Sequence, residues 1–458
     1  MGRLSTLFAP DRVAVVGASD EAGSVGRAVT GHLVEDFRGE VLAVNPNRET
    51  VLGLVCHDSL SALDSPGEVD VAVVVVPPGP AVEAVREAGA VGIGNVVVVT
   101  AGFSEAGSEG AARERELVAA AEAYDLNLVG PNSLGVMSTP SGLNATFAPT
   151  SPDPGSISFM SQSGAFITAV LDWASERRLG FKDVVSLGNK AVLDESDFVQ
   201  EWGEDPDTDV VLGYLEDVAD GRRFVEVASE VTRETPVVVV KSGRTEAGAT
   251  AAASHTGAMA GSDRAYEAGL AGAGVVRVDT VQELFDAAAV LSGQPLPDRQ
   301  EVAIVTNAGG PGVMTTDAVG DTDLGLADFT DDTREALREA LPEGANIHNP
   351  VDIIGDAPVE RFERALETVL ADPNVGMAVV LACPTATLSF EDLAEMTVDL
   401  QAEHGVPMAA VLMGGASTRS ATATLSEAGI PSYFDPARAS DSLETLAEYA
   451  ETRERETV

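Results

Sequence analysis

The sequence predicts an α/β protein made of three successive Rossmann-like or flavodoxin-like doubly wound domains. A short apolar strand, a turn of small residues and a helix-like segment occur in this order three times, and the strands open at Val13, Ile157 and Val302. This spacing is about one domain. Further strands are continuous β-branched runs such as 69–78 and 236–243. Such runs indicate parallel strands that are buried on both faces.

Helix-like segments alternate with these strands along all 458 residues. This alternation predicts doubly wound sheets with helices on both faces. Two stretches rich in Pro, Gly and polar residues, 145–156 and 292–300, are candidate boundaries. We therefore expect domains at 1–146, 147–296 and 297–458.

The charge of the chain excludes several classes of partner. Acidic residues number 73 against 28 basic ones, a formal net charge of −45. Such a surface repels nucleic acid and anionic membranes. Only three basic residues are lysines: Lys182, Lys190 and Lys241. An acidic, lysine-poor chain resembles the proteins of halophiles that accumulate salt, because concentrated salt screens self-repulsion.

The sequence also predicts a cytoplasmic protein. No apolar run reaches transmembrane length, and the first residues enter a strand pattern without the features of a signal peptide. The two cysteines, Cys56 and Cys383, lie far apart and form no metal-ligand pattern. A reducing compartment is the simplest setting for such a chain.

The first domain has the features of a nucleotide-binding unit. Its turn "VVGASDEAGSVG" places three glycines between a strand and a helix, where the backbone can approach a phosphate. The spacing departs from the strict dinucleotide fingerprint, and helix packing alone is the alternative explanation. The residues expected to contact the ligand here are Gly17, Ala18, Ser19, Gly23, Val25 and Gly26.

The end of the second strand favours CoA or NADP over NAD. NAD-binding units usually carry an acid there, but this chain has Asn45, Pro46 and Asn47, followed by Arg48. The alternative is that these residues form an ordinary turn. Pro77 ends another strand at the same edge of the sheet, where ligands collect, so we include it in the cofactor site.

The second domain offers an anion site. In "SQSGAF", Ser161, Ser163 and Gly164 stand at a helix start, where free N–H groups and hydroxyls suit a phosphate. An ordinary serine N-cap is the alternative. Lys190 and Lys241 follow strands beside glycine-rich loops, which predicts that they contact anions.

His255 lies in "AAASHTGAMAG", among residues too small to bury it. It is either an incidental loop residue or an accessible nucleophile that accepts a phosphoryl group. An acidic residue could orient its second ring nitrogen. Glu216, which follows an apolar strand, is the first candidate for this role, and its neighbour Asp217 is the second. His255 has no second histidine or cysteine near it in the sequence, so the pattern does not predict a metal site.

These motifs, with "TAGFSEAG", "GPNSLG", "SLGNKA" and "NPVDIIGDA", run in order along nearly the whole chain. Together they resemble the α subunits of ADP-forming acetate–CoA ligases, in the succinyl-CoA synthetase superfamily. The resemblance implies a reversible reaction in which acyl-CoA, phosphate and ADP give acid, CoA and ATP, through an acyl phosphate and a phosphohistidine. It implies that His255 is phosphorylated, that Glu216 supports it, and that Ser161, Ser163, Gly164 and Lys241 bind phosphate.

The resemblance further implies that the first domain binds CoA and that the third is a ligase-type domain. ADP or ATP with Mg²⁺ would lie mainly on a separate ATP-grasp β subunit, in an α2β2 or larger assembly. Two positions depart from the family pattern: Ser133 replaces a common cysteine, and Asn47-Arg48 stands where many members have a lysine.

Two other functions stay under consideration. One is a CoA-binding regulatory or acyltransferase-associated module, but such modules tend to lose the phosphorylated histidine, which this chain retains. The other is an NAD(P)-dependent oxidoreductase, which only the glycine turn supports.

Overall fold

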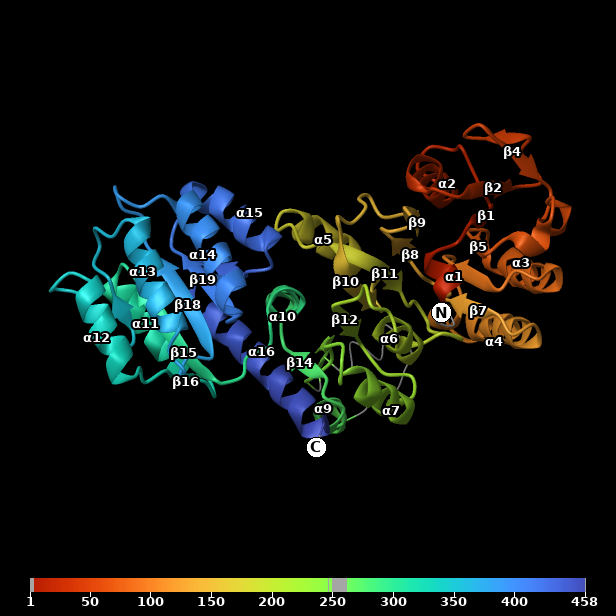
Figure 1. Ribbon diagram of the computed structural model, residues 1–458. Helices are drawn as coiled ribbons and strands as arrows, with labels where there is room; N and C mark the ends of the chain where they lie inside the picture. Colours follow the sequence, from red (N-terminus) through yellow and green to blue (C-terminus); the bar gives the residue numbers. More distant parts are fainter. Residues whose placement is uncertain (1–3, 246, 249–261, 458) are drawn as a thin grey trace. The chain divides into compact units, whose positions relative to one another are not determined.

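The computed structural model describes residues 4–245, 247–248 and 262–457. The chain divides into two units, Met1–Asp279 and Thr280–Val458. The first unit contains two sheets and the second unit contains one, and helices flank each sheet (Figure 1). The predicted α/β fold with three strand–turn–helix units is confirmed.

The first sheet has the order β3-β4-β2-β1-β5-β6-β7 and is parallel except for the β3–β4 pair. Its strands are β1 (Arg12–Val16), β2 (Glu40–Val44), β3 (Thr50–Val51), β4 (Leu54–His57), β5 (Val71–Val74), β6 (Asn95–Val98) and β7 (Asn127–Val129). β5 and β6 are buried at every residue, as the continuous valine runs predict.

Helices cover both faces of this sheet. Val13 and Val15 of β1 share a core with Val29 and Leu33 of α2, whereas Ala14 points to the opposite face, toward α3 and α4. The helical segments are α1 (Ser5–Phe8), α2 (Val25–Asp36), η1 (Leu60–Ala62), η2 (Pro66–Glu68), α3 (Pro78–Val91), η3 (Ser104–Ala106) and α4 (Ser108–Ala123).

The second sheet has the order β14-β13-β12-β10-β11-β8-β9. Its strands are β8 (Gly135–Ser138), β9 (Leu143–Thr146), β10 (Pro154–Ser161), β11 (Phe181–Ser186), β12 (Val210–Leu215), β13 (Val237–Lys241) and β14 (Val276–Val278). β8 and β9 form an antiparallel hairpin on β11. The predicted boundary at residue 146 therefore follows a hairpin that already belongs to the second sheet.

The helices around the second sheet are α5 (Gly164–Ser175), α6 (Glu195–Gly203), α7 (Gly221–Val231) and α9 (Asp263–Gly272). Met160 of β10 shares a core with Phe198 of α6 and Phe224 of α7. The neighbouring Phe159 points to the other face, where its ring meets Phe166 of α5 at 6.3 Å. This sheet is therefore doubly wound as well.

The second unit contains the third sheet, in the order β16-β15-β18-β19-β20, with β17 paired to β15. Its strands are β15 (Glu301–Thr306), β16 (Gly325–Leu326), β17 (Val351–Asp352), β18 (Met377–Ala382), β19 (Met408–Leu412) and β20 (Ser432–Tyr433). All the pairings in this sheet are parallel. Its helices are α10 (Val281–Gly293), α11 (Gly309–Gly320), α12 (Asp331–Ala340), α13 (Val359–Leu370), α14 (Phe390–His404), η4 (Ala416–Thr418), α15 (Arg419–Glu427) and α16 (Pro436–Thr457).

Helix α10 falls in the second unit, although the expected boundary lies after it, at residue 296. The helix contacts α16, and Arg438 of α16 donates hydrogen bonds to Asp286 of α10 at 2.7 and 2.9 Å. These contacts give the physical reason for the division near residue 280. The limits of the three expected domains stay a prediction.

Candidate functional site

The glycine turn after β1 is shaped by close backbone packing. Gly17 has φ +98°, and a Cβ there would lie 2.9 Å from Val76 Cγ1. A Cβ on Gly26 would lie 2.3 Å from the Gly17 carbonyl oxygen, so α2 can approach the turn only if residue 26 is glycine. Gly23, with φ +81°, would meet nothing within 4 Å. Packing therefore explains Gly17 and Gly26 without a ligand, and Gly23 lies at the open side of the turn.

The rest of this turn is tied to the end of β2. The Asn45 side chain donates to the Ala18 carbonyl at 2.8 Å and accepts from the Asn47 N–H at 2.9 Å. The second bond is the Asx turn that the alternative explanation of this segment predicts. Ser19 accepts from the Glu21 N–H at 3.0 Å. The turn of the alternative explanation is thus present at Asn45, and the same side chain holds the glycine loop, which the sequence did not predict.

Arg48 does not stand alone at this edge. Its guanidinium pairs with Asp20 at 3.0 Å, and both side chains are exposed. Pro46 and Asn47 are also exposed. A phosphate that used Arg48 would compete with Asp20, so this ion pair weakens the case for a phosphate contact at Arg48.

A cavity of about 800 Å³ in the first unit brings the two halves of the predicted site together. Its wall includes Val25 and Pro77 from the first domain, and Ser163 and Gly164 at the start of α5. Of the predicted site residues that the structure describes, these four line the cavity. The volume is in the range of cofactor pockets.

Sequence reasoning missed several residues of the cavity wall. Gln162 stands between two predicted residues of the same motif, and Ser133 was noted only as a departure from the family pattern. The Ser133 hydroxyl donates to the Ser186 carbonyl at 2.6 Å and accepts from the Gly135 N–H at 2.9 Å. Val25 and Phe147 are exposed apolar side chains at the cavity. Phe147 had no signal beyond its place in the predicted linker.

The "SQSG" turn has the geometry of a helix start. The Ser163 hydroxyl caps α5 by accepting from the Phe166 N–H at 3.3 Å. The Ser161 hydroxyl is buried, donates to the Ser163 carbonyl at 3.0 Å and accepts from the Ser163 N–H at 3.0 Å. The N-cap alternative is therefore present in the structure. It leaves the positive end of α5 at the cavity, which suits an anion.

Glu216 and Asp217 follow β12 at the same carboxyl edge, one strand from β10. Gln162 accepts hydrogen bonds from the main-chain N–H groups of both residues. Burial raises the pKa of the Asp217 carboxyl, but the Lys190 ammonium and the hydrogen bonds from Lys190 and Gln162 together bring it below its ordinary value. Asp217 is therefore engaged with Lys190 and Gln162, and the assignment of Glu216 as the acid that orients a histidine stays a prediction.

The prediction that Lys190 contacts an anionic ligand is not supported. Its ammonium lies 2.8 Å from Asp217 Oδ1 and 2.9 Å from Glu195 Oε2, in the protein interior. Two carboxylates already neutralise its charge. The sequence could not reveal this, because the two acids lie 5 and 27 residues away.

Lys241, at the end of β13, is 5% exposed. Its ammonium lies 4.5 Å from the centre of the Tyr266 ring and donates to the Ser242 carbonyl. Burial lowers the pKa of Lys241, and the charge of Arg277 lowers it further, against the opposing charges of Asp217, Asp263 and Glu216. A desolvated cation at this edge would attract a phosphate strongly, and the phosphate-binding role of Lys241 stays a prediction.

His255 lies outside the residues that the structure describes. Among the described residues, no group of three or more His, Cys, Asp or Glu side chains could hold a metal ion. Nor does any described helix combine the length and apolar character needed to cross a bilayer.

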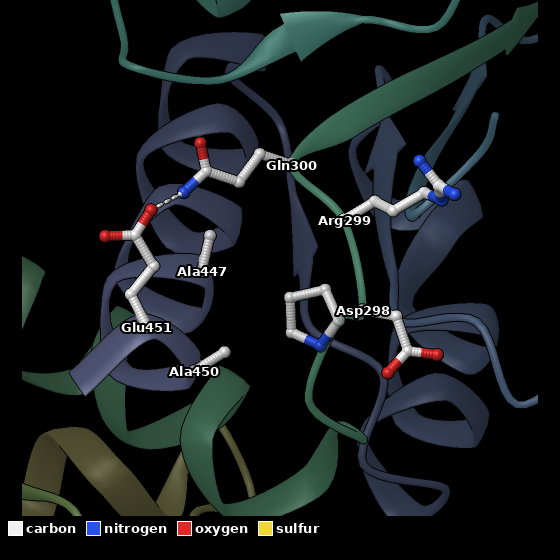
Figure 2. A pocket seen from close by; sticks show the side chains of 7 residues that line it. Asp298, Arg299, Gln300, Ala447, Ala450 and Glu451 are labelled. Carbon is white, nitrogen blue, oxygen red and sulfur yellow. Dashed lines mark hydrogen bonds between the residues drawn. The ribbon is translucent and has the colours of Figure 1, made fainter. Parts of the chain in front are cut away.

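The second unit has a small cavity of about 160 Å³ (Figure 2). Gln300 donates a hydrogen bond to Glu451 at one side, and Asp298 and Arg299 lie on the chain leading into β15. None of the predicted site residues lines this cavity. In the glycine loop after β15, Asn307 exchanges hydrogen bonds of 2.9 and 3.0 Å with the main chain of Cys383.

Comparison with known proteins identifies the family. The α subunit of the ADP-forming acetate–CoA ligase I of Pyrococcus furiosus is 40% identical over 452 residues, which cover 98% of both chains. This chain belongs to the family of ADP-forming acetate–CoA ligase α subunits. Family models match a CoA binding domain at 11–139, a succinyl-CoA ligase like flavodoxin domain at 154–291 and a ligase-CoA domain at 302–450.

Two further relatives of the family agree. The ADP-forming acetate–CoA ligase I of Archaeoglobus fulgidus is 45% identical over 457 residues, and this chain spans 65% of its length. The acetyl-coenzyme A synthetase 1 of Candidatus Korarchaeum cryptofilum, solved with phosphate and ADP, matches with a TM-score of 0.93 and 36% identity, over 99% of this chain and 98% of that one. The names of these relatives favour a ligase component over the regulatory module and the oxidoreductase.

Proposed function

We propose that this chain is the CoA-binding, phosphohistidine-bearing component of an ADP-forming acyl-CoA ligase. The observation that carries the proposal is the cavity of about 800 Å³, whose wall joins Val25 and Pro77 at the glycine turn to Ser163 and Gly164 at the start of α5. A ligand in this cavity would lie against the predicted CoA turn and the predicted phosphate site together.

The glycine turn and its surroundings fit CoA. Gly23 leaves the turn open where a side chain would otherwise stand, and the buried Gly26 lets α2 start close behind it. The exposed apolar side chains of Val25 and Phe147 offer contacts for an uncharged arm. The ligand contacts assigned to Gly17, Ala18, Ser19, Gly23, Val25, Gly26, Asn45, Pro46, Asn47 and Pro77 stay part of this proposal.

The chemistry has two transfers on this chain. A phosphate oxygen attacks the thioester carbonyl, the C–S bond breaks, and an acyl phosphate and CoA thiol result. A ring nitrogen of His255 then takes the phosphoryl group, the P–O bond to the acyl group breaks, and a carboxylate leaves. The N–H groups at the start of α5, the hydroxyl of Ser163 and the charge of Lys241 would hold the phosphoryl oxygens. The Ser161 hydroxyl would act through its two hydrogen bonds to Ser163, which fix the shape of the turn. Glu216 would hold the second ring nitrogen of His255.

The last transfer, from phosphohistidine to ADP, requires an ATP-grasp component. We propose that a separate β subunit supplies it, with Mg²⁺ on the nucleotide, in an α2β2 or larger assembly. The designation of the Pyrococcus furiosus relative as an α subunit supports a β partner. Both cysteines are free thiols, in keeping with a cytoplasmic enzyme.

Phosphoryl labelling tests the proposal. The chain is incubated in molar KCl with acetyl-CoA and labelled inorganic phosphate, with and without the ATP-grasp partner, and wild type is compared with His255→Asn. We expect an acid-labile, base-stable label on wild type alone. Absence of label from wild type, with an active partner and several acyl-CoAs tried, would favour the regulatory CoA-binding module.

A further inference from the structure

Gln162 links two parts of the candidate site. It lies between Ser161 and Ser163 in the predicted phosphate-binding turn and contributes to the wall of the cavity. Its own N–H donates to the Tyr214 carbonyl at 3.1 Å, so the main chain of this turn continues the ladder between β10 and β12. The anion turn and the end of β12 are therefore held together by backbone bonds.

The Gln162 side chain makes a second connection, to the turn after β12. Its Oε1 accepts from the N–H groups of Glu216 and of Asp217, the latter at 3.1 Å, and its Nε2 donates to Asp217 Oδ1. Only a carboxamide of this length offers both an acceptor and a donor here. A methionine would leave both N–H groups without this partner, and a glutamate would oppose the Asp217 carboxylate.

The far side of the same turn is anchored in the interior. Asp217 Oδ1 is bound by Lys190 at 2.8 Å, and Lys190 is bound by Glu195 at 2.9 Å. Glu195 also accepts from the Ala219 N–H at 2.6 Å, and its side chain is fully buried. The turn 216–219 is thus fixed at its end by a buried ion network and at its start by Gln162.

We propose that Gln162 is a positioning residue for Glu216. The inference rests on the proposed function, since it assumes that Glu216 orients the phosphorylated histidine. Without the Gln162 side chain, the N–H groups of Glu216 and Asp217 lose their hydrogen-bond acceptor. The glycine turn and the bonds of Lys190 to Glu195 and Asp217 are retained. The phosphoryl transfer should therefore slow while the affinity for acyl-CoA is retained.

The chain offers a matched control in Gln294, which lies in the other unit. Its Oε1 accepts from the Met408 N–H at 2.7 Å and from Gln401 at 2.8 Å, and its Nε2 donates to the Gly429 carbonyl at 2.6 Å. Gln294→Met and Gln162→Met therefore each remove one carboxamide that bridges two segments, buried at Gln294 and half-buried at Gln162. The pair separates a positioning effect from a general loss of stability.

The experiment measures turnover of acetyl-CoA, phosphate and ADP by each variant with the ATP-grasp partner, together with thermal unfolding. We expect Gln162→Met to lower kcat by about 100-fold, as misplacement by about 1 Å can do. We expect its KM for acetyl-CoA to stay within about threefold of wild type, because methionine has a similar size in the cavity wall and the glycine turn, Val25 and Pro77 are unchanged. Gln294→Met should melt earlier while keeping the wild-type kcat below its melting temperature.

Three results would overturn the inference. They are an equal loss of kcat in both variants, a loss confined to KM, and a wild-type kcat in Gln162→Met. If Gln162→Met does not fold, Gln162→Glu replaces it, because it keeps the shape and the acceptor, and we expect the same loss of kcat. Failure of both to fold would assign Gln162 a structural role and overturn the inference. A wild type without turnover or label would overturn the proposed function itself.

Discussion

The ammonium of Lys190 lies 2.8 Å from Oδ1 of Asp217, and its side chain is only 6% exposed. Lys190 itself has φ +55°, a conformation uncommon for a residue other than glycine. The pair connects the loop after β11 to the turn that carries Glu216. The lysine therefore contributes to the shape of the site rather than to anion binding.

Replacement of Lys190 should be strongly destabilising. Lys190→Met leaves the buried carboxylate of Glu195 and the half-buried carboxylate of Asp217 without their cation. We expect a loss of about 3–5 kcal/mol in the free energy of unfolding, measured with urea in molar KCl. The control is Arg222→Met, because Arg222 pairs with Glu226 on the surface of α7. That change should cost less than about 1 kcal/mol. Equal costs would show that the Lys190 network contributes no more than a surface pair.

Asp183 on β11 should make stability depend on pH. Its side chain is buried beside Ser138 and Trp202, and burial raises its pKa from 3.8 to about 6. The folded state thus holds this proton more tightly than the unfolded state. Below about pH 4 both states are protonated and this carboxyl costs nothing. As the pH rises from about 4 to 6 the free energy of unfolding falls by about 3 kcal/mol, because the unfolded state ionises first, and it keeps that lower value above pH 6.

Asp183→Asn removes that cost. We expect the variant to gain about 1–3 kcal/mol at pH 7.5 and to lose the gain near pH 4. Urea unfolding at both values measures the difference, with the exposed Asp58→Asn as control. A gain that does not change with pH would mean that the Asp183 carboxyl does not titrate in this range.

The glycine turn should tolerate no side chain at position 26. Gly26→Ala places a Cβ against the Gly17 carbonyl oxygen, so α2 must move away from the turn. We expect about 1–3 kcal/mol of destabilisation and at least about tenfold weaker binding of CoA, measured by calorimetry. Gly79→Ala in α3 is the control, because its Cβ would meet nothing within 4 Å. Wild-type CoA binding by Gly26→Ala would place the cofactor elsewhere.

The net charge of −45 should make folding depend on salt. Moving from about 0.1 M to 1 M KCl shortens the Debye length from about 10 to 3 Å and screens the self-repulsion of the acidic surface. We expect the melting temperature to rise over this range, and sucrose at equal osmolality to give a smaller rise. A melting temperature independent of KCl would contradict the halophilic interpretation.

The sequence by itself determined the fold class and the order of the parts. Runs such as β5 and β13 consist almost wholly of valine, and such runs indicate buried parallel strands whatever their neighbours are. The position of Ser163 at the start of α5 could also be predicted, because a helix start depends on the residues next to it. The motif order was sufficient for the family.

The tertiary structure alone decided which of these local features meet. It brought Val25 and Pro77 to the same cavity as Ser163, added the hairpin β8–β9 to the second sheet, and gave Lys190 two acids as partners. It also revealed the link from Gln162 to Glu216. Strand and helix patterns repeat over two to four residues and can be read along the chain. Contacts between segments that lie far apart in the chain depend on how the sheets pack, which no local pattern records.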